Sequence, residues 1–167
     1  ASGLSKTENL TPAHAQWDVF IKMLQQVCED LAKMIARDGE GATKLIQVDV
    51  TGAVNDEQAI QVGKSIVGSS LVKTAIFGRD MNWGRIIAAV GYSGADINPN
   101  TIDLAVGPIQ LLENSQPLAY EEKEALAYLD QDEITIKVDL KQGTGQGTCW
   151  GCDLTYEYIN INASYRT

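Results

Sequence analysis

The sequence predicts an α+β fold in which mixed or antiparallel sheets are covered by helices. Three patterns predict it: a long run of apolar residues at helical spacing, several runs that alternate apolar with polar residues, and an interleaving of the two without a strict βαβ rhythm. The 167 residues are 44% hydrophobic and 21% charged, which is the balance of a globular protein. We expect one compact domain, or one domain with part of a second.

The first third of the chain alternates helix with strand. Residues 1–15 are polar and aperiodic and are expected to form a lead segment or a cut end. From Trp17, apolar residues at steps of three and four predict a helix that ends at Asp38-Gly39. Alternation from Ile46 to Val50 predicts a strand, and Asn55 or Asp56 is predicted to cap a second helix.

The middle of the chain predicts a further strand, a helix and a hairpin. Leu71–Phe77 is predicted to be a strand, and Trp83–Val90 has the spacing of a helix. Ile102–Val106 alternates into the turn dipeptide Gly107-Pro108, so Ile109–Glu113 is the predicted hairpin partner.

The last third predicts a helix and two strands. Tyr120–Leu129 has the charge pattern of a surface helix, and Ile134–Leu140 alternates cleanly. Gly143–Gly147 could cradle a phosphate, but a phosphate loop needs a helix after it, and strand patterns flank this one. It is therefore predicted to be a flexible hairpin connection that leads to a last strand at Trp150–Tyr158.

Charge and composition limit the partners. A net charge of −9 without any basic run disfavours nucleic acid. A membrane span needs about 20 consecutive apolar residues, and neither such a run nor a signal peptide is visible. Three cysteines, an odd number, suit a reducing compartment. We therefore expect a cytoplasmic protein.

Cys149 and Cys152 form a CxxC motif, which raises the question of a zinc site. On a strand, residues three apart point to opposite faces, so the pair is poorly placed to chelate a metal. No second CxxC or histidine pair completes a site. The two are predicted to be structural thiols, and no metal is expected.

Two further candidates have structural interpretations. His14 is the only histidine, and its aperiodic surroundings are unsuited to positioning a catalytic base. In the corner Phe77–Arg85, Asp80 or Asn82 can cap the following helix, and Arg79 with Asp80 is predicted to be a local ion pair.

Glu40 stands between two glycines at the end of the long helix. In one interpretation Gly39 ends the helix in the left-handed conformation, Gly41 is a second conformationally flexible residue, and Glu40 is merely solvated. In the other, the glycines hold a short loop where a ligand can approach, and the carboxylate binds an amino group. The residues alone leave both open.

Four segments carry linked motifs in a fixed order. They are RDGEGATK at Arg37–Lys44, LVKTAIFGRDMNWGRI at Leu71–Ile86, EITIKVDL at Glu133–Leu140 and CDLTYEYININASYRT at Cys152–Thr167. Together they resemble the C-terminal part of the β-chain in the glutamate N-acetyltransferase (ornithine acetyltransferase) family of arginine biosynthesis. Met81 stands where the family often has proline, which should alter only the local turn.

The resemblance implies a larger assembly. It places residues 16–54 in a main α/β/β/α sandwich and residues 55–167 in a smaller C-terminal α+β domain with a docked tail. Members of the family arise from a precursor that cuts itself before a threonine, which becomes the nucleophile. By resemblance this threonine lies upstream of Ala1, so we expect no catalytic residue in this chain. Its expected partners are the α-chain and the upstream β segment, in a higher oligomer.

The resemblance also implies the chemistry and the site. Acetyl is moved from N-acetylornithine to glutamate through an acetyl-threonine intermediate, which releases ornithine; no cofactor is expected, although acetyl-CoA is an alternative donor in bifunctional members. The family's substrate-binding residues fall on Glu40, Asn162 and Thr167. Two alternatives are a non-catalytic interaction subunit and a related self-cleaving aminopeptidase, and the C-terminal motif speaks against the aminopeptidase.

Overall fold

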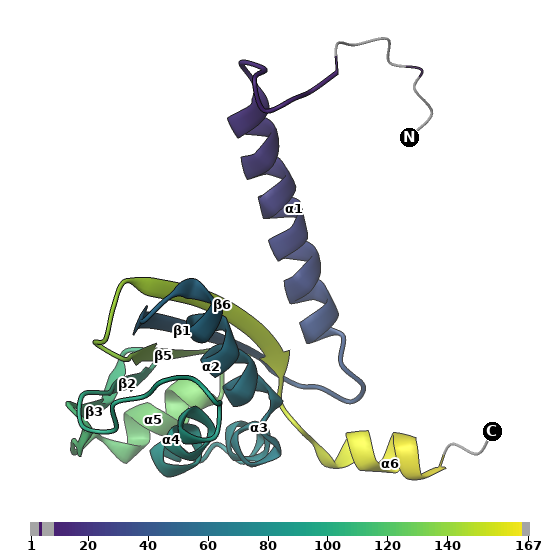
Figure 1. The fold of residues 1–167 in the computed structure, drawn as a ribbon. Coiled ribbons are helices and arrows are strands. Elements are labelled where there is room, and N and C mark those ends of the chain that lie inside the picture. The colour runs from purple at the N-terminus through teal and green to yellow at the C-terminus, as the bar shows by residue number, and fades with distance from the viewer. Residues whose placement is uncertain (1–3, 5–8, 165–167) are drawn as a thin grey trace.

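The computed structural model describes residue 4 and residues 9–164. Its elements are α1 (Trp17–Arg37), β1 (Leu45–Ala53), α2 (Asp56–Gly68), α3 (Ser70–Phe77), α4 (Trp83–Gly91), β2 (Asp103–Val106), β3 (Ile109–Glu113), β4 (Gln116–Pro117), α5 (Glu122–Leu129), β5 (Glu133–Asp139), β6 (Gly145–Cys152) and α6 (Tyr156–Ser164). Most of them form one body, from which α1 and α6 extend in different directions (Figure 1).

The strands form one six-stranded sheet in the order β4-β3-β2-β5-β1-β6. β1 pairs in parallel with β5 and antiparallel with β6, so the sheet is mixed. β2 and β3 form the predicted hairpin, and β2 also pairs antiparallel with β5. The predicted α+β class with a mixed sheet is confirmed. The described residues contain this one sheet, so the α/β/β/α sandwich stays an expectation for a longer protein.

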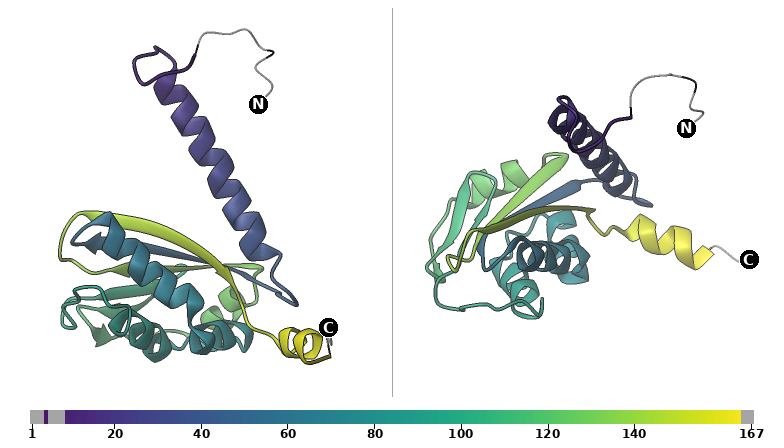
Figure 2. Two further views of the ribbon diagram at one scale, coloured as in Figure 1. Left: turned by 45° about the vertical axis from the view of Figure 1, so that its right-hand side comes forward. Right: turned by 45° about the horizontal axis from the view of Figure 1, so that its top comes forward.

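The hydrophobic core lies between the sheet and helices α2 to α5, which cover one face of it (Figures 1 and 2). Ile46, Val48 and Ile136 alternate toward this face and are fully buried. The intervening residues, such as Gln47 and Lys137, point to the other side, which we call the open face. Each fully buried aliphatic side chain contributes about 1.5–3 kcal/mol, so this single layer of contacts holds the body together.

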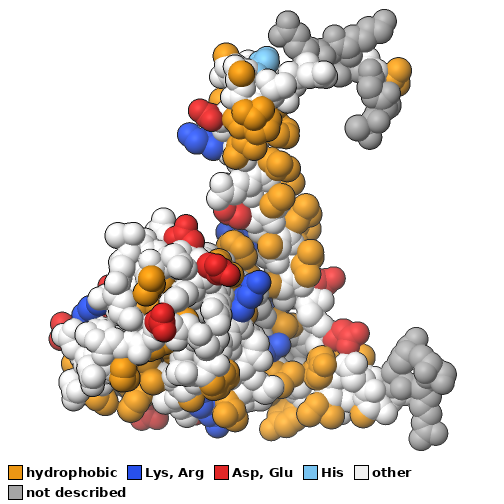
Figure 3. All heavy atoms as spheres, in the orientation of Figure 1, with side chains coloured by type: hydrophobic (Ala, Val, Ile, Leu, Met, Phe, Trp, Pro, Cys, Tyr) orange, Lys and Arg blue, Asp and Glu red, His pale blue; other side chains and the backbone are white. Residues whose placement is uncertain are grey.

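Helix α1 stands away from the body. It has no buried residue, and its apolar stripe is exposed, with Met34 and Ile35 at 65% and 76% of their full accessibility (Figure 3). Only its last turns approach the open face, where the Lys33 ammonium lies 5.3 Å from the centre of the Trp150 ring. A hollow of about 910 Å³ separates these turns from the ends of β1 and β5. None of the helices in residues 9–164 has the length and apolar character needed to cross a membrane.

The N-caps of α2 and α4 are among the residues predicted from the sequence. The Asn55 side chain accepts a hydrogen bond from Gln58 N, and the Asn82 side chain accepts one from Arg85 N, as N-caps of α2 and α4. The predicted pair of Arg79 with Asp80 is wrong: Arg79 instead reaches Asp130, 3.2 Å away across the surface. Arg79 has φ +56, which turns its side chain away from its neighbour.

The prediction of a strand at Leu71–Phe77 is wrong, because these residues form helix α3. Ser69 caps the helix by accepting a hydrogen bond from Val72 N. The buried residues Val72, Ala75 and Ile76 recur at steps of three and four, as a helix packed on a core requires. In so short a segment β-branched composition favours a strand, and the spacing was the better guide.

The predicted last strand at Trp150–Tyr158 is correct as far as Cys152 and wrong beyond it. β6 ends at Cys152, residues 153–155 form a linker, and α6 begins at Tyr156. The Gly-rich segment Gly143–Gly147 is not a hairpin connection, because β6 lies on the far side of β1 from β5. The chain therefore crosses the end of β1, and a Cβ atom on Gly145 would lie only 2.2 Å from the carbonyl carbon of Asn55.

The boundary expected between residues 54 and 55 falls directly after β1. This strand is hydrogen-bonded on both sides to β5 and β6, which belong to the later segment. In the described structure the sheet therefore spans that boundary, and α1 is the part of residues 16–54 that stands apart. The assignment of these residues to a separate sandwich stays a prediction.

Candidate functional site

The Glu40 loop, residues 38–44, connects α1 to β1. Asp38 closes the helix by donating its backbone N–H to the carbonyl of Met34. The left-handed residue of the loop is Gly41, with φ +66, and the left-handed conformation expected at Gly39 is absent. At Gly39 the close neighbour is a side chain: a Cβ atom there would lie 2.6 Å from the Cys152 sulfur, which would have to move. The two glycines therefore serve different purposes, and Glu40 between them is exposed.

Glu40 meets Asn162 of helix α6 although 122 positions separate them in sequence. The Asn162 Nδ2 donates one hydrogen bond to Glu40 Oε2, at 2.7 Å, and another to the carbonyl of Tyr158, at 2.9 Å. Two of the three predicted site residues are thus brought together by tertiary structure. The third, Thr167, lies outside the described residues.

The linker of residues 153–155 fastens this site to the body. Asp153 is 3% exposed and accepts hydrogen bonds from the backbone N–H groups of Thr43 and Lys44 and from the Thr43 hydroxyl. Thr155 is 5% exposed, and its hydroxyl donates to the carbonyl of Gly41 at 2.7 Å. The sequence analysis missed both residues. The available sign was a short polar side chain at each end of Asp153-Leu154-Thr155, a composition that favours side-chain to backbone bonds over a continued strand.

Neither Cys149 nor His14 is placed to act as a nucleophile at the site. Cys149 points toward α2, where its sulfur lies 3.6 Å from the carbonyl of Ile60, whereas Cys152 lies against Gly39. The prediction that they occupy opposite faces is confirmed. Burial raises the pKa of the Cys149 thiol, and the charge of Lys64 offsets this only in part, so the thiol stays protonated and poorly nucleophilic. His14 lies before α1, where its Nδ1 accepts a hydrogen bond from Gln16 N.

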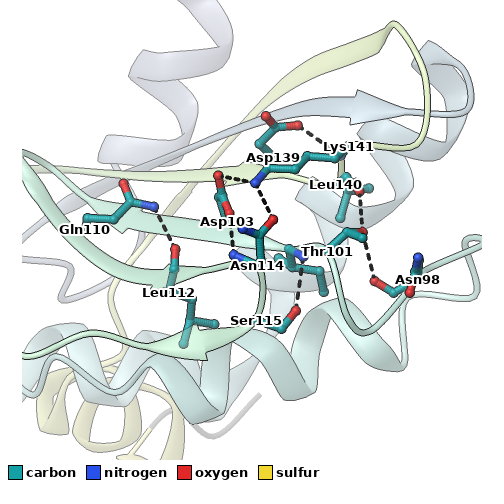
Figure 4. Close-up of polar contacts among 11 residues, drawn as sticks. Asn98, Thr101, Asp103, Gln110, Leu112, Asn114, Ser115, Asp139, Leu140 and Lys141 are labelled. Carbon is teal, nitrogen blue, oxygen red and sulfur yellow. Dashed lines mark hydrogen bonds and ion pairs between the residues drawn. The ribbon is translucent and has the colours of Figure 1, made fainter.

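A second polar cluster lies on the open face, at the end of the β2–β3 hairpin (Figure 4). The Lys141 ammonium lies 2.7 Å from Asp103 Oδ2 and donates to Asn114 Oδ1 at 2.8 Å, while Asn114 N donates to Asp103 Oδ1 at 2.7 Å. Burial acts to raise the pKa of Asp103, but the hydrogen bonds from Lys141 and Asn114 and the charge of Lys141 outweigh it and leave this pKa lowered. The groups satisfy one another, which gives the cluster a structural role.

Metal binding finds no support in the geometry of residues 4 and 9–164, where no three His, Cys, Asp or Glu side chains gather closely enough to hold an ion. The chemistry that the Glu40 and Asn162 pair offers is recognition: one carboxylate can face a cation, and the Asn162 amide oxygen can accept a hydrogen bond, because its Nδ2 already donates to Glu40 and to the carbonyl of Tyr158. Neither side chain of this pair is a nucleophile of the kind that forms the proposed acetyl intermediate.

Fold and site together define an α+β protein with a polar site built from a helix-end loop and helix α6. The family model described as "ArgJ family" matches residues 1–167. The chain is 59% identical to the arginine biosynthesis bifunctional protein ArgJ of Geobacillus kaustophilus and 61% identical to that of Halalkalibacterium halodurans. It belongs to the ArgJ family, so the resemblance stated from its motifs is confirmed.

The matches also show how much of the relatives this chain represents. All of the chain is aligned in both, but it spans only 41% of the length of either relative. A crystal structure of the arginine biosynthesis bifunctional protein ArgJ from Bacillus halodurans matches with a TM-score of 0.95 and 61% identity. That match covers 99% of this chain and 78% of the crystallised one, so the fold described above is that of a solved relative.

Proposed function

We propose that this chain is the substrate-binding part of an acetyltransferase of arginine biosynthesis that moves acetyl from N-acetylornithine to glutamate. The observation that carries the proposal is the hydrogen bond between Glu40 and Asn162 in a member of the ArgJ family. The resemblance of the motifs implies that both residues contact the substrate. Thr167 is proposed as the third contact. The enzyme is proposed to act in the cytoplasm.

The proposed reaction has two halves. A threonine hydroxyl from outside this chain attacks the acetyl carbonyl of N-acetylornithine, the C–N bond breaks, and ornithine leaves with the proton of the hydroxyl. The amine of glutamate then attacks the acetyl ester, the C–O bond breaks, and the threonine regains its proton. Atoms and charges balance without a cofactor. Because the remaining amine of N-acetylornithine is cationic, an exposed carboxylate such as Glu40 is a suitable contact for it.

The proposed partners follow from the length of the relatives. An α-chain and an upstream β segment of the same precursor would supply the nucleophile and the oxyanion site, and the complete enzyme is proposed to form a higher oligomer. The relatives are named bifunctional, and we propose acetyl-CoA as a second acetyl donor.

The test is acetyl transfer by the longer protein that contains this chain. With radiolabelled N-acetylornithine as donor, label is expected in N-acetylglutamate, and acid quenching should trap label on a threonine. Transfer to water alone would favour the hydrolytic alternative, and the absence of both products would reject the proposed function. Replacement of the donor by acetyl-CoA tests the second donor separately.

A further inference from the structure

We infer that Asp153 and Thr155 are positioning residues, which set the geometry between Glu40 and Asn162 without touching the substrate. This inference rests on the function proposed above. The two residues lie in the linker of residues 153–155, which continues directly into α6. One short segment therefore holds the Glu40 loop at one end and carries Asn162 at the other.

Asp153 fixes the second half of the Glu40 loop. Its carboxylate is buried, with 3% exposure, and it accepts hydrogen bonds from Thr43 N at 2.8 Å and from Lys44 N at 3.0 Å, in addition to the Thr43 hydroxyl. The Asp153 backbone N–H in turn donates to the carbonyl of Lys44 at 3.2 Å. The loop therefore donates hydrogen bonds to the linker and the linker donates one back, next to the first residue of β1.

Thr155 fixes the first half of the loop. Its buried hydroxyl donates to the carbonyl of Gly41, the residue next to Glu40. The contact is close enough that a Cβ atom on Gly41 would lie 2.7 Å from the Cβ of Glu157 and 2.9 Å from Tyr158 N. The backbone beside Glu40 therefore packs directly on the first turn of α6, about one turn before Asn162 in the same helix.

The contact between Glu40 and Asn162 is too exposed to hold this arrangement by itself. Both side chains are accessible to water, and an exposed polar contact contributes little to order. Asp153 and Thr155 are themselves buried, and their bonds to the loop are buried or partly buried, so breaking one of them leaves a largely desolvated side chain without its hydrogen bond. The bonds of the linker, and not the exposed hydrogen bond between Glu40 and Asn162, therefore keep these two residues close to one another.

The test uses the longer protein and compares Thr155→Val with Thr155→Ser. Valine has the shape of threonine but cannot donate to Gly41, so the KM for N-acetylornithine is expected to rise about tenfold while kcat changes little. Serine keeps the hydroxyl and should keep the wild-type KM. Asp153→Asn should act in the same direction, and where it does not fold the Thr155 series decides.

A double variant separates positioning from general structure. If Thr155 acts through Glu40, then Thr155→Val combined with Glu40→Gln should have the KM of Glu40→Gln alone. Multiplied effects, or an unchanged KM in Thr155→Val, would overturn the inference while leaving the proposed function intact. If the wild-type protein transfers no acetyl, the proposed function fails, and crystal structures still decide the positioning: Thr155→Val should lose the hydrogen bond between Glu40 and Asn162, and Thr155→Ser should keep it.

Discussion

Glu40 is the residue whose charge the proposed substrate site depends on. In Glu40→Gln the amide oxygen can still accept the hydrogen bond from Asn162, so the variant removes charge and keeps shape. We predict that its KM for N-acetylornithine rises roughly ten- to a hundredfold, the value of a charge-assisted hydrogen bond to the cationic amine. Steady-state kinetics of the longer protein measure this.

The matched control is Glu157→Gln. Glu157 is a second exposed carboxylate near the loop, and it accepts its hydrogen bond from Asn160. Its removal is expected to leave the KM within about twofold, since it lacks the contact to Asn162. Equal effects of the two variants would mean that the site responds to local charge in general and not to Glu40.

The lowered pKa of Asp103 predicts that the stability of the fold depends on pH. Because its folded pKa is lowered, its stabilising contacts are fully present above its ordinary pKa of about 3.9 and are lost as the pH falls through the lower folded value. Asp103→Asn is therefore expected to lower the free energy of unfolding by about 1 kcal/mol at pH 6, and the difference should shrink below pH 4.

Urea unfolding at both pH values measures the effect, with Asp130→Asn as its control. Asp130 belongs to the exposed pair with Arg79, whose side chains are 54% and 69% accessible, so this substitution should change little at either pH. A difference for Asp103→Asn that is independent of pH would show that its carboxylate charge is not what stabilises the fold.

At the scale of elements, regular patterns were predictable and junctions were not. The spacing of apolar residues predicted α1, and alternation predicted β1 and β5. The bonding partners of Asp153 could not be predicted, because Thr43 and Lys44 lie 110 and 109 positions earlier. Segments in which long-range hydrogen bonds override local propensity are where a sequence pattern fails.

The crossing at Gly145 gives a prediction about an element junction. A Cβ atom there would overlap the backbone of Asn55, which cannot move without disturbing the N-cap of α2. We predict that Gly145→Ala lowers the free energy of unfolding by about 2 kcal/mol or more, as overpacking against backbone does. Gly68→Ala, at a helical glycine with open space around its Cα, should be neutral or stabilising by up to about 1 kcal/mol. Comparable losses in both variants would contradict the close approach.

At the scale of the whole molecule, the pair of Glu40 and Asn162 can bind a ligand but offers no nucleophile of its own. We predict that purified residues 1–167 fold and yet transfer no acetyl. Among the described residues, Cys149 is buried with a raised pKa, and His14 precedes α1, whereas the Glu40 loop follows the other end of this helix. The assay is label transfer from N-acetylornithine, with circular dichroism to verify folding. Turnover by this chain alone would show that its own residues include the nucleophile.

Because α1 is exposed, we expect its amide protons to exchange with deuterium much faster than those of the sheet. A helix without a buried residue is marginal in water, so its N–H groups should exchange with deuterium at rates near those of a free peptide. The N–H groups of β1 that pair with β5 and β6 should exchange only through global unfolding. The border should fall within the Glu40 loop, just before the Ala42 amide, which donates to the carbonyl of Gly39 and directly follows the Gly41 carbonyl that Thr155 holds. The amide of Glu40 thus lies two residues on the labile side of the border, and whatever slows exchange in α1 should also slow it there.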